Sequence, residues 1–472
     1  MEKNGLPRKD WIVVALLGLI SMTCGLVFRE FVQDDAFITY RYARNIARGY
    51  GFVYNRGEHV LGTTTPLYTL WLALLGKVSG QDIRTISHWS SILSLWFGGS
   101  ILYFLGKWRG FLQAVAVSLI FVTNPLLAWS VGMETSFFIL FLMLVLITYV
   151  HKRLSLTGVL LGLLVLIRYE AALLALILAA HYFIKHRGPP WELVSGLPLF
   201  SAWAIFAWRT FGSIIPQSAS AKLIAARLPF AVGAAIYWRL YVNQNQLYLF
   251  VPYLLALGGY STIRVRRPKL GFFLILIWSI VYFIAASILA GSFPWYYGPL
   301  IPGFAILTVS GTDFLIGLST QLFSRLKVSD RVKRAVPRFL LVGAILALTA
   351  MQVDSWRTPG TIHLGRRVDR RYVVYKEIAA WLNQNAQEDD TLAAAEIGVL
   401  GYYTDMRIID LYGLVTPELK PSNREDLTNT LGRAIALYDP DFVVTKNDSM
   451  TEYLESHPGY WPAKSFDDGA YV

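Results

Sequence analysis

The feature that most constrains this chain is the recurrence of apolar runs, many of them close to the ~20 residues that a helix needs to cross a bilayer. We place these runs at residues 11–28, 84–106, 110–128, 134–150, 154–167, 170–184, 192–208, 246–262, 270–290, 299–319 and 338–353. Only 16% of the residues are charged, against about 25% in a typical soluble domain. We therefore predict a mainly α, polytopic transmembrane bundle of about 11 helices.

Basic clusters occupy every second gap between the apolar runs. They lie at residues 107–109, 151–153, 185–187, 264–269 and 325–338. Cytoplasmic loops of membrane proteins carry an excess of Lys and Arg, so we predict that these gaps are cytoplasmic. The N-terminus is then inside and the C-terminus outside, and the first run is a retained span. The net charge of +12 is explained by these basic clusters in the predicted cytoplasmic gaps. We therefore exclude nucleic acid as a partner.

Two longer segments lie outside the predicted spans. Residues 29–83 form the first external loop of the transmembrane domain, which we place at 1–353. Residues 354–472 change character, with helical periodicity over 372–385 followed by strand-like stretches at 391–403, 406–414 and 441–447. Turn signals separate these stretches. We predict a small extracytoplasmic α/β domain at 354–472 that helps to recognise an acceptor.

The first external loop contains an acidic pair and a stripe of arginines. Asp34 or Asp35 can cap a helix that runs to about residue 48, where glycines at 49 and 51 end it. Arg41, Arg44 and Arg48 share one helical face, beside an apolar face. This pattern is typical of a helix in the membrane interface, with its cations towards lipid phosphates. A capping role explains one aspartate and leaves the second without a structural reason.

Further charges lie at the external ends of other apolar runs. Glu134 begins a predicted span, where a carboxylate is favoured by the helix dipole. Acids so close to hydrocarbon are costly, however, and are often functional. Arg168, Tyr169 and Glu170 occupy a tight external turn, where the two charges either pair only with each other or serve a ligand.

An aromatic turn and a single histidine complete the external candidates. Trp295 and Tyr296 suit a membrane-interface belt as well as a sugar-binding face. His59 is the one histidine of the first loop and is interpreted as a loop residue or a ligand. No spacing of His, Asp and Glu resembles a defined metal site.

The opening motif "DDAFITYRYARNIARGYGFVYNRGEHVLGTTTPLYTLWLALLG" resembles the first external loop of the type C integral membrane glycosyltransferases. Within that family it is similar to the branch of mycobacterial terminal arabinofuranosyltransferases, and more distantly to the protein mannosyltransferases and lipid A aminoarabinose transferases. Weaker matches follow in order at "GMETSFF" (132–138), "IRYEA" (167–171), "IIPQSASAK" (214–222) and "EIGVLGYYTDMRIIDLYGLVTPEL" (396–419). The chain departs from the family at Gln217, usually Asn, and at Ala219 and Ser220, where an aromatic pair is usual.

The resemblance implies a polyprenyl-phosphate sugar donor and a cell-envelope glycan, lipid or protein acceptor. The sugar would be a pentose such as arabinofuranose. An aspartate base would drive inverting attack on the extracytoplasmic face of the inner, or cell, membrane. Some members need a divalent cation such as Mg²⁺ or Mn²⁺. The implied catalytic residues are Asp34, with Asp35 as helper or alternative, and Glu134. The implied donor or phosphate ligands are Arg41, Arg44, Arg168, Tyr169, Glu170 and Lys222, and the implied acceptor or sugar contacts are Trp295, Tyr296 and His59.

Two other classes of function fit parts of the pattern. A transporter or lipid flippase also carries ionisable residues within its spans. Here the charges gather on one side of the membrane, and no internal repeat is visible, so an enzyme is favoured. A scaffold or receptor would leave the acidic pair unexplained.

Overall fold

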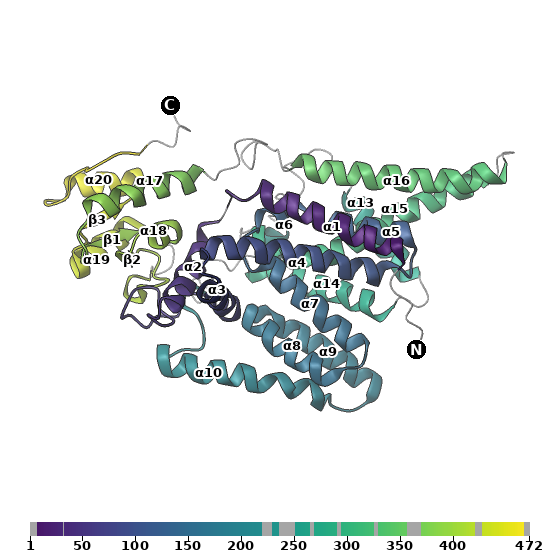
Figure 1. The fold of residues 1–472 in the computed structure, drawn as a ribbon, viewed down its shortest axis with the longest axis horizontal. Helices are drawn as coiled ribbons and strands as arrows, with labels where there is room; N and C mark the ends of the chain where they lie inside the picture. Colours follow the sequence, from purple (N-terminus) through teal and green to yellow (C-terminus); the bar gives the residue numbers. More distant parts are fainter. Residues whose placement is uncertain are drawn as a thin grey trace.

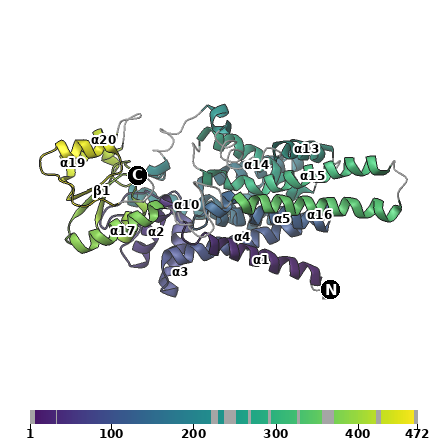
Figure 2. The same ribbon diagram turned by 90° about the horizontal axis from the view of Figure 1, so that it is seen from above.

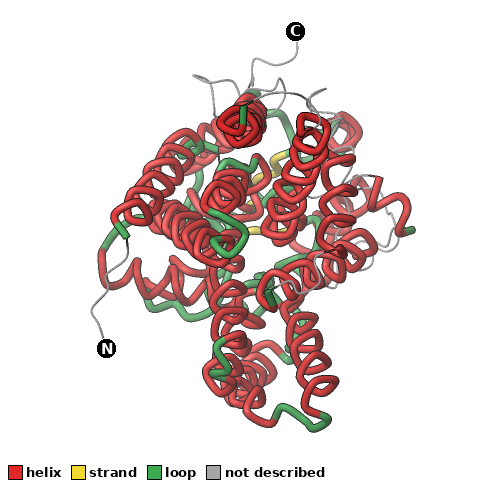
Figure 3. Tube along the Cα trace, turned by 90° about the vertical axis from the view of Figure 1, so that its right-hand side faces the viewer, coloured by secondary structure: helices red, strands yellow, loops and turns green. Residues whose placement is uncertain are grey.

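The structure is a computed structural model that describes residues 7–31, 33–219, 229–235, 251–264, 269–289, 294–324, 329–355, 370–420 and 427–466. Long helices form a bundle along the long axis of the molecule (Figure 1). Their bounds are α1 Arg8–Val27, α4 Ile83–Gly106, α5 Phe111–Val122, α6 Pro125–Trp129, α7 Thr135–Val150, α8 Leu154–Ile167, α9 Ala172–His186, α10 Leu197–Phe211, α13 Val251–Arg264, α14 Leu270–Leu289, α15 Ile301–Ser324 and α16 Asp330–Ser355. Figure 3 looks along this bundle and shows the helices packed side by side.

A helix lies at each of the apolar runs expected from the sequence. Within the described residues, six helical segments are long and apolar enough to cross a membrane, and α7 and α8 are shorter apolar helices. Together they confirm a mainly helical integral membrane protein. The number of helices that cross the bilayer, and the orientation of the termini, stay predictions.

The first loop is structured, and its first helix is buried in protein. α2 spans Asp34–Ala47 and α3 spans Pro66–Ser79. α2 ends before Gly49 and Gly51, both of which adopt a positive φ of 89° that favours glycine. Nine of the 14 residues of α2 are buried, Arg41 among them. The predicted bounds of α2 are therefore confirmed, its buried faces pack against protein, and its position at the membrane interface stays a prediction.

The C-terminal part is a small α/β unit around a parallel sheet of three strands. Its elements are α17 Arg370–Asn385, β1 Thr391–Ala394, α18 Gly398–Tyr403, β2 Arg407–Asp410, the 3-10 turn η5 Pro417–Leu419, α19 Leu427–Tyr438, β3 Phe442–Val444 and α20 Asp448–Ser456. The strand order is β2-β1-β3. Leu392 and Ile408 belong to the same buried cluster as α17, whereas Ala393 and Ile409 pack with α19 and α20. Helices thus cover both faces, as parallel sheets require.

The connection after β1 differs from the expectation that 391–403 is extended. Residues 398–403 form the short helix α18, which packs against α2 of the first loop. Figures 1 and 2 show the C-terminal unit at the end of the bundle opposite the start of α1, on the same side as α2. The first loop and the C-terminal unit therefore form one contiguous layer at one end of the bundle.

Candidate active site

Asp34 binds the N-terminus of α18, which lies 364 residues later in the chain. Its two carboxylate oxygens accept hydrogen bonds from the backbone amides of Gly398 (2.9 Å) and Val399 (2.8 Å). The first amides of a helix have no partner within that helix, so Asp34 caps α18. It does not cap α2, whose N-cap residue is Gln33 with no side-chain cap bond. The expectation that Asp34 or Asp35 caps its own helix is therefore wrong.

Burial of the Asp34 carboxyl group raises its pKa to about 7. The amides of Val399 and Gly398 lower this pKa, and the negative charges of Asp35 and Glu396 raise it further. Because burial outweighs the amide hydrogen bonds, Asp34 exchanges its proton near neutral pH.

Asp35 lies on another face of the same helix. Successive residues of an α-helix are turned by about 100°, and Asp35 shares its face with Thr39, one turn later. The Thr39 hydroxyl lies 3.3 Å from that of Thr63 and 3.4 Å from that of Thr65. The two adjacent acidic side chains therefore lie on different faces of α2. Asp34 belongs to the seam with the C-terminal unit, and Asp35 shares the helical face of Thr39.

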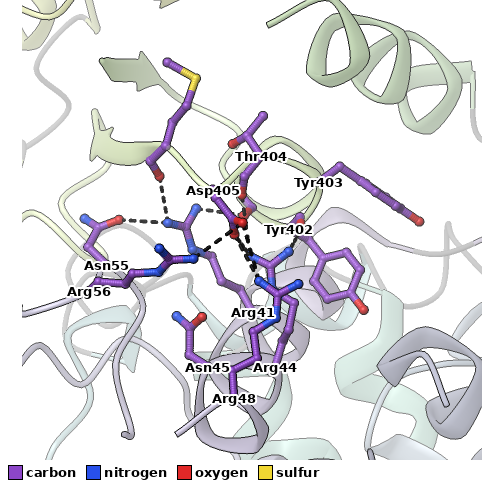
Figure 4. Close-up of polar contacts among 12 residues, drawn as sticks. Arg41, Arg44, Asn45, Arg48, Asn55, Arg56, Tyr402, Tyr403, Thr404 and Asp405 are labelled. Carbon is purple, nitrogen blue, oxygen red and sulfur yellow. Dashed lines mark hydrogen bonds and ion pairs between the residues drawn. The ribbon is translucent and has the colours of Figure 1, made fainter. Parts of the chain in front are cut away.

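The arginine face of α2 holds the C-terminal unit. Arg41 is 3% exposed, and its guanidinium donates to Tyr54 O (2.8 Å), Gly401 O (2.7 Å), Met406 O (2.8 Å) and Asn55 Oδ1 (3.2 Å). Arg44, Arg48 and Arg56 converge on Asp405 at 3.1, 3.2 and 3.4 Å. Figure 4 shows this convergence. The prediction that this face meets lipid phosphates is therefore wrong, because these guanidinium groups contact protein.

A buried ion cluster gathers predicted residues from three separate motifs. Arg168 is 3% exposed, and its Nη2 lies 3.0 Å from Glu170 Oε1 and 3.4 Å from the Tyr282 hydroxyl. Its Nη1 lies 3.6 Å from Glu134 Oε1, and its guanidinium carbon lies 5.0 Å from the ring centre of Tyr296. Glu134 occupies the N-cap position of α7 but makes no side-chain cap bond, so helix capping does not explain it.

Hydrogen bonds tie this cluster's surroundings to the first loop. The Tyr40 hydroxyl of α2 donates to Gly132 O at 2.6 Å, two residues before Glu134. The amide of Gln217 donates to Leu61 O at 2.9 Å, and Ser218 Oγ donates to Gly62 O at 2.7 Å. The segment that leads to Lys222 is thereby fixed to the first loop. Lys222 itself lies outside the described residues.

An apolar cavity of 470 Å³ lies between α8, α9, α10 and the 3-10 turn η2 Trp191–Gly196. Its lining includes Leu161, Val165, Ala175, Leu176, Trp191 and Phe200. The helices that line this cavity are connected to the ion cluster. Arg168 and Tyr169 join α8 to α9, and Trp203 of α10 donates a hydrogen bond to the Tyr169 hydroxyl at 3.2 Å. This cavity has the size and the lining of a site for hydrocarbon.

The remaining predicted residues are spread over two places. Trp295 and Tyr296 lie on the 3-10 turn η4 Pro294–Leu300, where Tyr296 borders the ion cluster. His59 is exposed in the first loop. Within the described residues, no group of three His, Cys, Asp or Glu side chains is arranged to hold a metal ion.

Sequence reasoning missed the seam between α2 and α18. The sequence feature that could have revealed this seam is the pair of glycines at 398 and 401, which are three residues apart and therefore lie on one helical face. A Cβ at Gly398 would lie 1.9 Å from Asp34 O, and one at Gly401 would lie 1.9 Å from the Tyr54 hydroxyl. Both positions therefore require glycine for the close approach of α2.

The chain thus combines a helical membrane bundle, a structured first loop that carries an acidic pair, and a small α/β unit packed against that loop. The resemblance predicted from the opening motif is confirmed by comparison with known proteins. The fold matches that of ArnT from Cupriavidus metallidurans bound to undecaprenyl phosphate, with a TM-score of 0.55 and 16% identity over 90% of this chain and 88% of that one. Apo ArnT matches with a TM-score of 0.54 and 16% identity over 95% and 91% of the two chains.

In sequence, the chain is 25% identical over 366 residues to a terminal beta-(1->2)-arabinofuranosyltransferase of Corynebacterium glutamicum. The alignment covers 64% of this chain and 52% of that protein, so it spans about half the length of this curated relative. Residues 362–471 match a family described as a domain of unknown function, DUF8728. That match contains α17 to α20, while the exact domain boundary at 354 stays a prediction.

Proposed function

We propose that this chain is a membrane glycosyltransferase that moves a sugar from a polyprenyl-phosphate donor to a hydroxyl of a cell-envelope acceptor on the extracytoplasmic face. The observation that carries the proposal is the ion pairing of the buried Arg168 with Glu134 and Glu170, tied through Gly132 and Tyr40 to the helix that bears Asp35. The resemblance of the fold to ArnT, solved with undecaprenyl phosphate, supports a donor of this class.

The proposed reaction is a displacement at the anomeric carbon of the donor sugar. An acceptor oxygen attacks that carbon, its proton passes to a carboxylate, and the bond from the carbon to the phosphate oxygen breaks. The products are a glycoside of inverted configuration and polyprenyl phosphate, which carries the negative charge away. The site must therefore supply one base and groups that stabilise the leaving phosphate.

Asp35 is the better candidate for the base. Both oxygens of Asp34 accept backbone hydrogen bonds that hold α18, so proton transfer at Asp34 would compete with its structural contacts. Asp35 lies beside it on the face of Thr39, where hydroxyl groups gather. We therefore reverse the order expected from the sequence and place Asp34 as the residue that positions Asp35.

Arg168 is the better candidate for the phosphate ligand. Its Nη1 makes no hydrogen bond to the described residues, although a buried donor without an acceptor is costly. A phosphate oxygen would satisfy that donor, while Glu134 and Glu170 hold the guanidinium in place. Lys222 remains a proposed second ligand, whereas Arg41 and Arg44 act on the C-terminal unit. Tyr169 and Glu170 would then serve the donor by fixing Arg168, and Trp295, Tyr296 and His59 stay proposed sugar contacts.

The 470 Å³ apolar cavity is the proposed site for part of the polyprenyl chain. It lies beside the α8–α9 turn that carries Arg168, so the phosphate and the chain of one donor can be held together. The match with an arabinofuranosyltransferase supports a pentose such as arabinofuranose as the sugar. A divalent cation such as Mg²⁺ or Mn²⁺ stays compatible with this scheme.

The test is a transfer assay on the purified chain in lipid nanodiscs. The donor is synthetic polyprenyl-phospho-arabinofuranose, and the acceptor is an arabinan oligosaccharide. Transfer by the wild type that is lost in Arg168→Met, with an unchanged melting temperature, would support the assignment. A wild type that neither transfers nor hydrolyses the donor, with or without Mg²⁺, would contradict it.

A further inference from the structure

The carboxyl edge of the parallel sheet carries three polar or aromatic side chains at matched positions. In the register of the sheet, Ala394 pairs with Asp410 and with Val444. Glu396, Tyr412 and Lys446 each follow the end of a strand by two residues. The carboxyl ends of parallel strands meet at one edge, and open α/β sheets bind their ligands there.

Glu396 and Lys446 contact each other, and all three side chains stay accessible. Glu396 Oε2 accepts from the Tyr375 hydroxyl at 2.9 Å, and Glu396 Oε1 pairs with Lys446 Nζ. The Glu396 side chain is 24% exposed and that of Lys446 is 62% exposed, while Tyr412 is 43% exposed.

This edge faces the acidic pair of the first loop. Gly398 and Val399, whose amides bind Asp34, come directly after the Glu396 segment. The charge of Glu396 contributes to the raised pKa of Asp34, and it also contributes, after burial, to the raised pKa of Tyr412. Glu396 is therefore within electrostatic range of both the tyrosine and the acidic pair.

We infer that Glu396, Tyr412 and Lys446 bind the sugar acceptor and present its hydroxyl to the acidic pair. The inference rests on the proposed function. One carboxylate and one ammonium give a neutral pair that accepts from and donates to hydroxyl groups, and the tyrosine ring offers a face for the C–H groups of a sugar. A neutral polyol fits this pair better than an anion does, because the edge carries no excess positive charge.

Direct binding tests the site without relying on turnover. The full chain in nanodiscs, free of donor, is titrated with a synthetic arabinofuranose hexasaccharide, with maltohexaose as a second probe, and binding is followed by saturation-transfer NMR. Glu396→Gln and Tyr412→Ala should each raise the Kd about tenfold or more, as expected for loss of a charged hydrogen bond or a stacked ring. Glu388→Gln is the control, because Glu388 is exposed just before β1 at the opposite edge.

The outcomes separate this site from the proposed function. A wild type that binds neither hexasaccharide, or Glu396→Gln and Tyr412→Ala variants that bind as the wild type does, would overturn the acceptor site. Loss of binding in those two variants with no loss in Glu388→Gln would support it. If sugar binds at this edge but the wild type transfers no sugar, the acceptor site stands and the proposed function fails. If transfer occurs and the acceptor KM is unchanged in Glu396→Gln, the function stands and this site is wrong.

Discussion

At the scale of single residues, the central feature is the division of labour between two adjacent aspartates. The carboxylate of Asp34 accepts hydrogen bonds from two backbone amides of α18. Asp35 lies on the neighbouring face of α2. Asp35→Asn should lower transfer by ~10²- to 10⁴-fold, the usual contribution of a general base, without a change in melting temperature. The assay is single-turnover transfer under saturating donor. Asp34→Asn should be milder in kcat at optimal pH, and full activity of Asp35→Asn would contradict this assignment.

Asp34 also predicts a pH dependence of stability. Its folded pKa of about 7 lies above the 3.8 of a free aspartate side chain, so the fold favours the protonated acid. The stability from this preference is fully present below about pH 4 and is lost as the pH rises through about 7. Its size is at most about 4 kcal/mol, because the shift is roughly 3 pKa units and each unit corresponds to ~1.4 kcal/mol.

The measurement is the thermal denaturation of the wild type and of Asp34→Asn between pH 4 and pH 8. The asparagine does not titrate, so the difference between the two proteins isolates Asp34 from other groups such as Asp410, whose pKa burial also raises, to about 6. The wild type should lose stability relative to the variant as the pH rises. Parallel curves would show that the Asp34 pKa is not raised.

The acidic pair could be identified from the sequence, but its roles could not. Residue types and spacing indicated that one aspartate was structural and one was functional. The partner that decides between them lies 364 residues away, beyond the reach of any local pattern. Arg41 shows the same limit, since its helical spacing was correct and its partners, Gly401 and Met406, belong to the last quarter of the chain.

At the scale of elements, α18 depends on its glycine face. A methyl group at residue 401 would lie 1.9 Å from the Tyr54 hydroxyl and 2.8 Å from Arg41 Nη1. Gly401→Ala should therefore destabilise the seam by ~1–3 kcal/mol, the usual cost of overpacking. Limited proteolysis of the C-terminal unit should become faster in this variant.

The matched control is Gly317→Ala in α15, where a Cβ would meet no atom within 4 Å. Alanine favours a helix by up to ~1 kcal/mol over glycine, so this variant should be as stable as the wild type or slightly more so. If Gly401→Ala is cleaved no faster than Gly317→Ala, the close packing of α18 on α2 is not as described.

Sequence periodicity was sufficient for long elements and failed for this short one. Apolar runs located the membrane helices because burial in lipid demands a long stretch of one character. The segment at 398–403 has six residues, which is less than two helical turns, and its alternation suits a strand as well. Contact with α2 and the cap from Asp34 decide its conformation.

At the scale of the whole molecule, the layer formed by the first loop and the C-terminal unit predicts a topology. Both lie at the end of the bundle away from the start of α1 (Figure 2), and alternating basic gaps place that end outside the cytoplasm. Alkaline phosphatase fused after residue 472 should be active, because it folds only after export. A cytoplasmic reporter such as green fluorescent protein at the same position should stay dark, and fluorescence there would reverse the topology.

The seam between α2 and α18 also sets an order of events during synthesis. The first loop leaves the membrane early, whereas Gly401 follows Arg41 by 360 residues. At ~5–20 residues per second, a new chain waits roughly 20 to 70 s between them. During that interval Arg41 and Asp34 lack their final partners, so the outer surface of an unfinished chain exposes an unpaired charge and an open seam. Only a chain translated through its last quarter can close this seam, and a truncated chain would leave it open to proteolysis.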